Sequence, residues 1–180
     1  MKFLYTLAFF AFLLPLNGLE AQTEIKEANR PAFLLGDITP ADLERSPYNA
    51  WFTSGQTNYR PQAASLTPLK KSLRDLEFVL FLGTWCGDSK REVPRMLKLL
   101  EAAGVSENRI RLIALDRRPG KYKTSPEGLE KNYNIKRVPT LIVLKKGREI
   151  NRIIERPWST LEEDLLRITR QESYQARYSR

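Results

Sequence analysis

The sequence of 180 residues contains one cysteine and no histidine. A single cysteine cannot form a disulfide within the chain, so packing has to supply the stability of the fold. The usual nitrogen and sulfur ligands of a zinc or copper site cannot be assembled either, and no motif of oxygen ligands stands out. We therefore expect neither a metal nor another cofactor, and any chemistry rests on the one thiol, Cys86.

The sequence also lacks an apolar run long enough for a membrane-spanning helix. Its mostly apolar stretch at 3–16 is shorter than the roughly 20 residues that a span needs. Lys2 precedes this stretch, and polar residues at 17–20 lead to Ala21, which is the pattern of a cleavable export signal. We predict a signal peptide at 1–21, with a retained anchor as the alternative. The protein is then periplasmic or secreted from a bacterial envelope and not stably inserted in a membrane after cleavage.

The charge is strongly positive, with 30 basic against 21 acidic residues and a formal net charge of +9. The basic residues are spread along the chain, no nucleic-acid recognition motif is present, and export removes the opportunity to meet nucleic acid. We expect a solvated basic surface that attracts anionic lipids or acidic partners loosely, and no nucleic-acid partner. Hydrophobic residues make up 42% of the chain and charged residues 28%, which is typical of a globular protein.

The stretch at 22–76 is the least regular part of the chain. It contains several prolines, with short helical patterns at 41–44 and 47–52 and a clearer helix at 67–76. We predict an irregular and helical N-terminal extension that packs on the domain following it. Its aromatic residues either pack on that core or form a ligand-binding platform; they are Tyr48, Trp51, Phe52 and Tyr59.

Clear periodicity begins after residue 76. The uninterrupted apolar run at 78–82, ended by Gly83, predicts a strand buried on both faces of a sheet. Apolar residues at helical spacing up to Ala103 predict a helix, and Gly104 is a suitable left-handed stop. The pattern further predicts a strand at 110–115, a short helix at 125–133, strands at 141–144 and 149–154, and a last helix opened by a capping box of Ser159 and Glu162. The order is strand, helix, strand, helix, strand, strand, helix, within one α/β domain at 77–180.

Cys86 lies in the turn between the buried strand and the first helix of this domain. The sequence Trp-Cys-Gly-Asp-Ser at 85–89 places the sulfur beside the unsatisfied N–H groups at the helix N-terminus, where the helix dipole favours a thiolate. Lys90 and Arg91 favour the thiolate as well, whereas Asp88 opposes it. Cys86 is therefore a candidate nucleophile.

These residues resemble the thioredoxin family over about 78–170. The strand, the Trp-Cys-Gly-x-Ser turn, the helix and the Val-Pro-Thr sequence at 138–140 ahead of a hairpin carry the resemblance. Pro94 stands where thioredoxins have a helix-kinking proline, and Pro139 matches the family's cis-proline. The resemblance implies a thioredoxin-like α/β fold with a central mixed sheet flanked by helices. It also implies a cis Pro139 that lies across from Cys86.

The resemblance further implies a substrate groove beside the thiol. The backbone of Val138 would pair with an extended substrate segment, and Trp85 would border the groove or simply pack. The candidate catalytic residues are Cys86 and Ser89, and the candidate substrate-binding residues are Trp85, Gly87, Asp88, Val138 and Pro139.

Three positions depart from the family pattern. Ser89 replaces the second cysteine, so a mixed disulfide on Cys86 cannot be released from within, and turnover as a dithiol reductase is excluded. Leu80 stands where family members commonly have a buried aspartate that manages protons. Asp88 replaces the proline between the two cysteines, which changes the charge at the mouth of the site.

Two functions fit this pattern. In the first, Cys86 exchanges thiols and disulfides as a monothiol isomerase or reductase, Ser89 donates a hydrogen bond to the thiolate, and an external thiol completes the cycle. Its partners are protein or small-molecule thiols and disulfides. In the second, the domain is a non-catalytic binding or scaffold module of the cell envelope. Peroxide sensing through a sulfenic acid on Cys86 is a third reading, for which no supporting second residue is seen.

Overall fold

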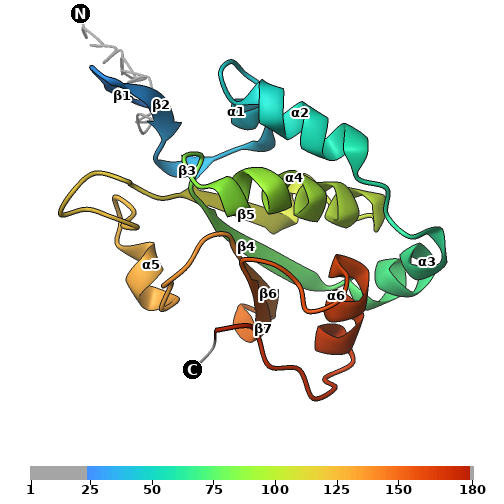
Figure 1. Cartoon of the computed structure of the whole chain (residues 1–180). Helices are drawn as coiled ribbons and strands as arrows, with labels where there is room; N and C mark the ends of the chain where they lie inside the picture. The colour runs from blue at the N-terminus through green and yellow to red at the C-terminus, as the bar shows by residue number, and fades with distance from the viewer. Residues whose placement is uncertain (1–23, 179–180) are drawn as a thin grey trace, which may run out of the picture.

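The structure, a computed structural model, describes residues 24–178, and the predicted signal peptide at 1–21 lies outside them. Within this part a five-stranded mixed sheet runs in the order β3-β5-β4-β6-β7, with helices on both faces (Figure 1). None of the helices in this part combines the length and apolar character that a membrane span requires.

The central strand is β4 (Leu76–Leu82), which the apolar run predicted. It pairs in parallel with β5 (Ile110–Ala114) and antiparallel with β6 (Thr140–Lys145). Residues 78–82 are all buried, because both faces of the sheet are covered. Leu80 in the middle of the strand has no exposed surface.

The outer strands are antiparallel to their neighbours. β7 (Arg148–Ile154) forms a hairpin with β6, as the sequence predicted. The other edge is β3 (Gly36–Ile38), a three-residue strand from the N-terminal extension that pairs with β5. The extension therefore contributes a strand to the main sheet, which the sequence analysis did not predict.

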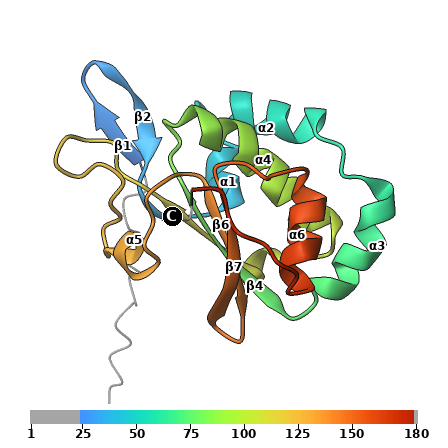
Figure 2. The same ribbon diagram turned by 60° about the horizontal axis from the view of Figure 1, so that its bottom comes forward.

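Helix α4 (Gly87–Ala102) follows β4 after a short turn and covers one face of the sheet. Its buried apolar side chains recur at helical spacing, Pro94 lies inside it, and Gly104 just beyond its end has a φ of 78°. Helix α6 (Leu161–Thr169) covers the same face, as Figure 2 shows. The main hydrophobic core lies between these two helices and the sheet.

The opposite face carries a smaller apolar cluster and the one-turn helix α5 (Leu129–Asn132) (Figure 2). The sequence predicted a helix over 125–133, but Ser125 to Gly128 form a turn. Gly128 has a φ of 69°, outside the helical region, and the Ser125 hydroxyl accepts a hydrogen bond from Leu129 N at 2.9 Å. The helix therefore begins only at Leu129. A single turn of 3-10 helix, η1 (Glu107–Arg109), precedes β5.

The N-terminal extension contains α1 (Pro40–Leu43), α2 (Asn49–Asn58) and α3 (Ala63–Ser72). The predicted helix at 67–76 was misplaced, because α3 begins before Pro68 and Leu76 already belongs to β4. All three helices add side chains to the main core. The four aromatic residues at 48, 51, 52 and 59 lie in this core or pack against it.

The extension begins with a hairpin of β1 (Glu24–Glu27) and β2 (Arg30–Leu34), which the sequence analysis also missed. The backbone N–H of Leu34 donates to the buried hydroxyl of Thr84 at 3.1 Å. This bond attaches the end of β2 to the turn that follows β4.

One capping residue differs from the prediction. Thr160, not Ser159, caps α6, and its hydroxyl accepts from the N–H of Glu163 at 3.1 Å. Thr160 has the extended backbone of an N-cap, so the cap falls one residue later than the pattern indicated. The order of elements from β4 onward agrees with the predicted order.

Candidate functional site

Cys86 is the N-cap residue of α4 and is half-buried. Its backbone is extended, with φ −89° and ψ 129°. Its N–H donates to the carbonyl of Gly83 at 2.8 Å, and its own carbonyl accepts from Lys90 N at 3.0 Å. The turn between β4 and α4 is therefore closed by hydrogen bonds on both sides of the cysteine, and the sulfur lies at the N-terminus of a sixteen-residue helix.

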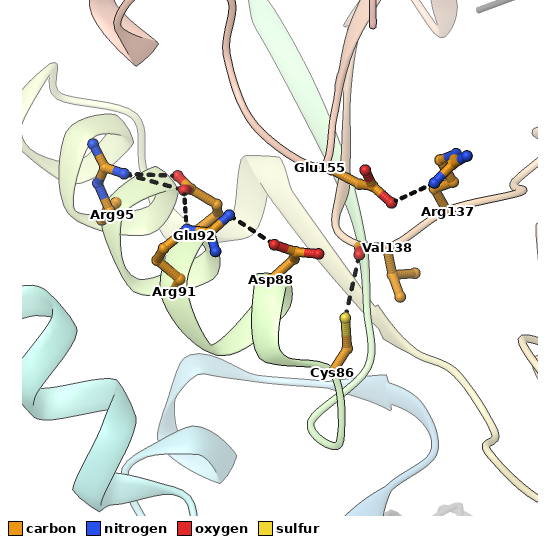
Figure 3. Close-up of polar contacts among 8 residues, drawn as sticks. All are labelled: Cys86, Asp88, Arg91, Glu92, Arg95, Arg137, Val138 and Glu155. Atoms are coloured by element: carbon orange, nitrogen blue, oxygen red, sulfur yellow. Dashed lines mark hydrogen bonds and ion pairs between the residues drawn. The ribbon is translucent and has the colours of Figure 1, made fainter. Parts of the chain in front are cut away.

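The sulfur faces a loop that is distant in sequence. Cys86 Sγ donates a hydrogen bond to the carbonyl oxygen of Val138 at 3.4 Å (Figure 3). The Val138–Pro139 peptide bond is cis, as the resemblance implied. The structure thus brings Cys86, Val138 and Pro139 together, while their roles in catalysis and substrate binding stay predictions.

Three hydrogen bonds hold the proline loop, residues 136–140. The Thr140 hydroxyl donates to the carbonyl of Arg137 at 2.8 Å, and the N–H of Glu155 donates to the carbonyl of Pro139 at 2.7 Å. Arg137 also forms an ion pair with Glu155 at 3.0 Å (Figure 3). The backbone that faces the sulfur is therefore held in place by contacts within the domain.

Ser89 does not have the expected contact. Its side chain is fully buried, and its oxygen accepts a hydrogen bond from Gly83 N at 3.1 Å. Among the hydrogen bonds of residues 24–178, none joins Ser89 to Cys86 Sγ. The physical reason is that Gly83 lies just beyond the end of β4, where its buried N–H needs an acceptor. Ser89 therefore stabilises the turn that carries Cys86.

Trp85 is half-buried beside the cysteine and is held by packing and one hydrogen bond. Its indole N–H donates to the carbonyl of Leu115 at 2.8 Å. A Cβ at Gly83 would lie 2.7 Å from its ring, so only glycine allows the ring to lie there. The ring also lies 5.2 Å from that of Tyr122, between centroids. Trp85 therefore packs on the domain and, with the exposed Tyr122, forms an aromatic border near the thiol.

Tyr122 belongs to the basic loop, residues 116–124, which the sequence analysis did not assign to the site. Asp116 anchors this loop: it is buried and accepts hydrogen bonds from the backbone and the guanidinium of Arg118 at 2.6–3.0 Å. Burial raises the pKa of Asp116, but the hydrogen bonds and charge of Arg118 outweigh it, so the pKa is lowered overall. The only sequence signal for this loop is a tyrosine in a run rich in basic residues.

The charged residues near the thiol pair with one another. Asp88 accepts a hydrogen bond from Arg91 at 2.7 Å, and Arg91 also binds Glu92 at 2.8 Å (Figure 3). These contacts raise the pKa of Arg91, and the hydrogen bond to Glu92 has the largest effect. Arg91 thus pairs with carboxylates, and among the hydrogen bonds of residues 24–178 none joins it to the sulfur of Cys86. Gly87 is exposed, and a Cβ there would meet nothing within 4 Å, so one side of the site is open.

Within residues 24–178 no group of three or more histidine, cysteine, aspartate and glutamate side chains is arranged to hold a metal ion. The acidic side chains near the thiol are occupied by arginines.

The topology and the site define a thioredoxin-like fold with a single cysteine. The parallel pair β4–β5, the antiparallel β6–β7 hairpin and a cysteine at the start of α4 facing a cis-prolyl loop are its diagnostic features. No protein-family model and no curated protein matches the sequence.

Several solved structures are similar to the chain. A protein of unknown function from Pseudomonas aeruginosa is 14% identical, over 75% of this chain and 93% of that one, with a TM-score of 0.48. Thioredoxin f2 from Chlamydomonas reinhardtii is 20% identical, over 44% of this chain and 66% of that one, with a TM-score of 0.32. Mitochondrial thioredoxin 3 from Saccharomyces cerevisiae is 27% identical, over 49% of this chain and 76% of that one, with a TM-score of 0.32. We base the fold assignment on the strand order and the site geometry.

Proposed function

We propose that the protein is an exported monothiol thiol–disulfide exchange protein in which Cys86 is the nucleophile. The observation that carries this proposal is the half-buried sulfur at the N-terminus of α4, 3.4 Å from the carbonyl oxygen of Val138. In this proposal the positive end of the α4 dipole favours a thiolate at this position. The proline loop presents a fixed backbone edge to whatever binds over the sulfur.

The chemistry consists of two exchange steps. The Cys86 thiolate attacks one sulfur of a substrate disulfide R–S–S–R′, which forms a Cys86–S–S–R mixed disulfide and releases R′–S⁻, and that thiolate takes a proton from water. A second thiolate R″–S⁻, formed when an external thiol loses its proton to water, attacks the mixed disulfide, forms R–S–S–R″ and releases the Cys86 thiolate. The net reaction exchanges R′ for R″ with no net oxidation. Because Ser89 replaces the resolving cysteine, the second thiol comes from outside the chain.

The surroundings of Cys86 would position the substrate. An extended segment that pairs with the backbone at Val138 would place its disulfide over the sulfur, with Trp85 bordering one side and Gly87 leaving the other open. The partners are protein or small-molecule thiols and disulfides. Their location, the periplasm or the exterior, follows from the predicted signal peptide at 1–21. Mass spectrometry of the N-terminus of the protein from the envelope fraction tests the predicted export and the removal of residues 1–21.

A kinetic comparison tests the reactivity of Cys86. Free cysteine is only a few per cent thiolate at neutral pH, so a stabilised thiolate reacts on the order of tenfold faster with iodoacetamide or a model disulfide. We expect this acceleration in the purified protein, and no reaction after Cys86→Ser. A Cys86 that reacts no faster than free cysteine contradicts the proposal. Adducts trapped on Cys86 in the native compartment then identify the substrates by mass spectrometry.

The second candidate is a non-catalytic binding module of the cell envelope. Two observations favour it: the Ser89 hydroxyl is used by Gly83, and Leu80 provides no proton carrier in β4. In this case Cys86→Ala leaves the binding of partner proteins unchanged. Loss of partner capture in this variant, with the fold intact by circular dichroism, eliminates the scaffold function.

A further inference from the structure

A basic hollow of about 260 Å³ opens beside the proline loop. Its charged lining residues are Lys136, Arg137 and Arg152, and Asn134, Thr140 and Tyr178 complete most of its wall. No aspartate or glutamate is among the described residues that line it. The hollow therefore has three cations and no carboxylate in its wall.

The hollow adjoins the backbone that faces the sulfur. Arg137 and Thr140 immediately flank Val138 and Pro139 in the chain, and both line the hollow. An extended segment that runs along the backbone at Val138 therefore passes the mouth of the hollow. Because successive side chains of an extended segment point in opposite directions, every second side chain can face the hollow.

Each of the two arginines of the hollow is paired with a carboxylate that does not line it. Arg137 pairs with Glu155 at 3.0 Å and lies 4.2 Å from the centre of the Tyr178 ring. Arg152 binds both carboxylate oxygens of Glu149 at 2.6 Å. These contacts fix the guanidinium groups and compensate part of their charge.

Lys136 differs from the two arginines in its surroundings. It is exposed, and within the described part of the chain no carboxylate lies at ion-pair distance from its ammonium. Its carbonyl accepts a hydrogen bond from the ammonium of Lys123 at 3.0 Å, which brings a second lysine of the basic loop to the proline loop. The ammonium of Lys123 lies 5.2 Å from the centre of the Tyr122 ring. A continuous rim thus runs from Trp85 through Tyr122 and Lys123 to Lys136.

The acidic residues near this rim are already neutralised. Asp88 pairs with Arg91 and Asp116 with Arg118. The uncompensated charge at the rim is therefore that of the lysines, and the surface around the thiol is complementary to carboxylates.

We infer that Cys86 acts on disulfides in acidic polypeptide segments, whose carboxylate side chains bind in the basic hollow and along the rim. This inference rests on the proposed exchange function and names its substrate class. The aromatic surface of Trp85 and Tyr122 covers the apolar part of the segment, and the lysines increase the rate of encounter.

Peptides of matched length test the inference. Each contains one cysteine as a mixed disulfide with a chromophoric leaving thiol, flanked by glutamates, glutamines or lysines. We expect Cys86 to react fastest with the glutamate peptide and slowest with the lysine peptide, and the difference to shrink as salt is added. Lys136→Glu should lower the rate with the glutamate peptide about fivefold at low salt. Lys145→Glu is the matched control, because Lys145 is an exposed lysine at the opposite end of β6 from the proline loop.

The outcomes separate the two proposals. Equal rates for all three peptides at low salt, or equal effects of Lys136→Glu and Lys145→Glu, overturn the inference and leave the exchange function intact. If no peptide reacts faster with Cys86 than with free cysteine, the proposed exchange function itself is contradicted. A dye-labelled glutamate peptide with serine for cysteine provides a second readout, because its binding to Cys86→Ser protein does not depend on reactivity. We expect Lys136→Glu to weaken this binding, and no binding at low salt contradicts the inference.

Discussion

Gly55 of α2 lies against the ring of Pro94 in α4, so closely that a Cβ on Gly55 would be 2.4 Å from Pro94 Cγ. No side-chain carbon fits at that distance, so this contact sets how near the two helices approach (Figure 1). Helix α4 presents Cys86 at its first turn. The N-terminal extension and the helix that carries the thiol are therefore positioned together.

Gly55→Ala should destabilise the protein by about 1–3 kcal/mol, because α2 has to move away from Pro94. A loss of stability would be informative, because alanine normally stabilises a helix relative to glycine by about 1 kcal/mol. Gly87→Ala is the control: Gly87 is also in a helix but nothing lies within 4 Å of its Cβ, so alanine should not destabilise the protein there and should stabilise it by up to about 1 kcal/mol. Urea unfolding of both variants measures the difference. A Gly55→Ala protein as stable as the wild type shows that the helices adjust freely.

Thr84→Val should cost about 1–3 kcal/mol, because it leaves the N–H of Leu34 without its buried acceptor while keeping the side-chain shape. Thr84→Ser keeps the oxygen and should preserve the bond. Hydrogen exchange of the Leu34 amide reports on the same bond, and it should accelerate in the valine variant only. Equal exchange in both variants contradicts the role of Thr84 in attaching β2.

The lowered pKa of Asp116 predicts how stability depends on pH. A carboxyl whose pKa is lower in the folded state stabilises the protein above its unfolded pKa, about 3.9, and this contribution is lost as the pH falls through the folded value. The difference in unfolding free energy between wild type and Asp116→Asn should therefore be largest above about pH 5 and narrow below about pH 4. Arg118→Gln removes the guanidinium hydrogen bonds and their charge but keeps the backbone donor, so it should weaken the pH dependence without abolishing it. If the difference in unfolding free energy between wild type and Asp116→Asn does not change with pH, Arg118 does not stabilise the ionised form of Asp116.

Ser89→Cys should turn the site into a dithiol site. A thiol three residues after Cys86 can attack the mixed disulfide, releasing the reduced substrate and leaving a disulfide between the two positions that dithiothreitol reduces. We expect catalytic reduction of insulin by dithiothreitol well above the rate with wild-type protein. Adding Cys86→Ser to this variant is the control and should abolish the gain. If the Ser89→Cys protein folds normally but does not accelerate insulin reduction, the groove does not accept a disulfide.

The elements that the sequence predicted well are those with a strong local pattern. β4 is buried on both faces, so it appears as an unbroken apolar run, and α4 follows from apolar spacing that ends at Gly104. β3 has only three residues, too few for a period, and it exists because it pairs with β5 far along the chain. The position of α3 was misjudged because Pro68, a usual helix breaker, lies inside it.

The site was predictable where local order determines it. A strand followed directly by a helix places Cys86 at a helix start, whatever the rest of the chain does. The proximity of Val138 followed only from the family resemblance, since 52 residues separate the two. Tyr122 and Lys123 could not be assigned to the rim from sequence, because their place depends on the anchor that Asp116 provides and on contacts across the fold.

Leu80 has a consequence for proton movement around the thiol. The side chain of Leu80 is buried and apolar at the position where thioredoxin family members commonly have a buried aspartate, so that position cannot take up or release a proton. In the proposed exchange, protons would then be taken from and returned to the bulk water on the open side next to Gly87. If the proposal holds, the buffering of the surrounding fluid, and not an internal relay at that strand, would govern how readily a departing thiolate is protonated.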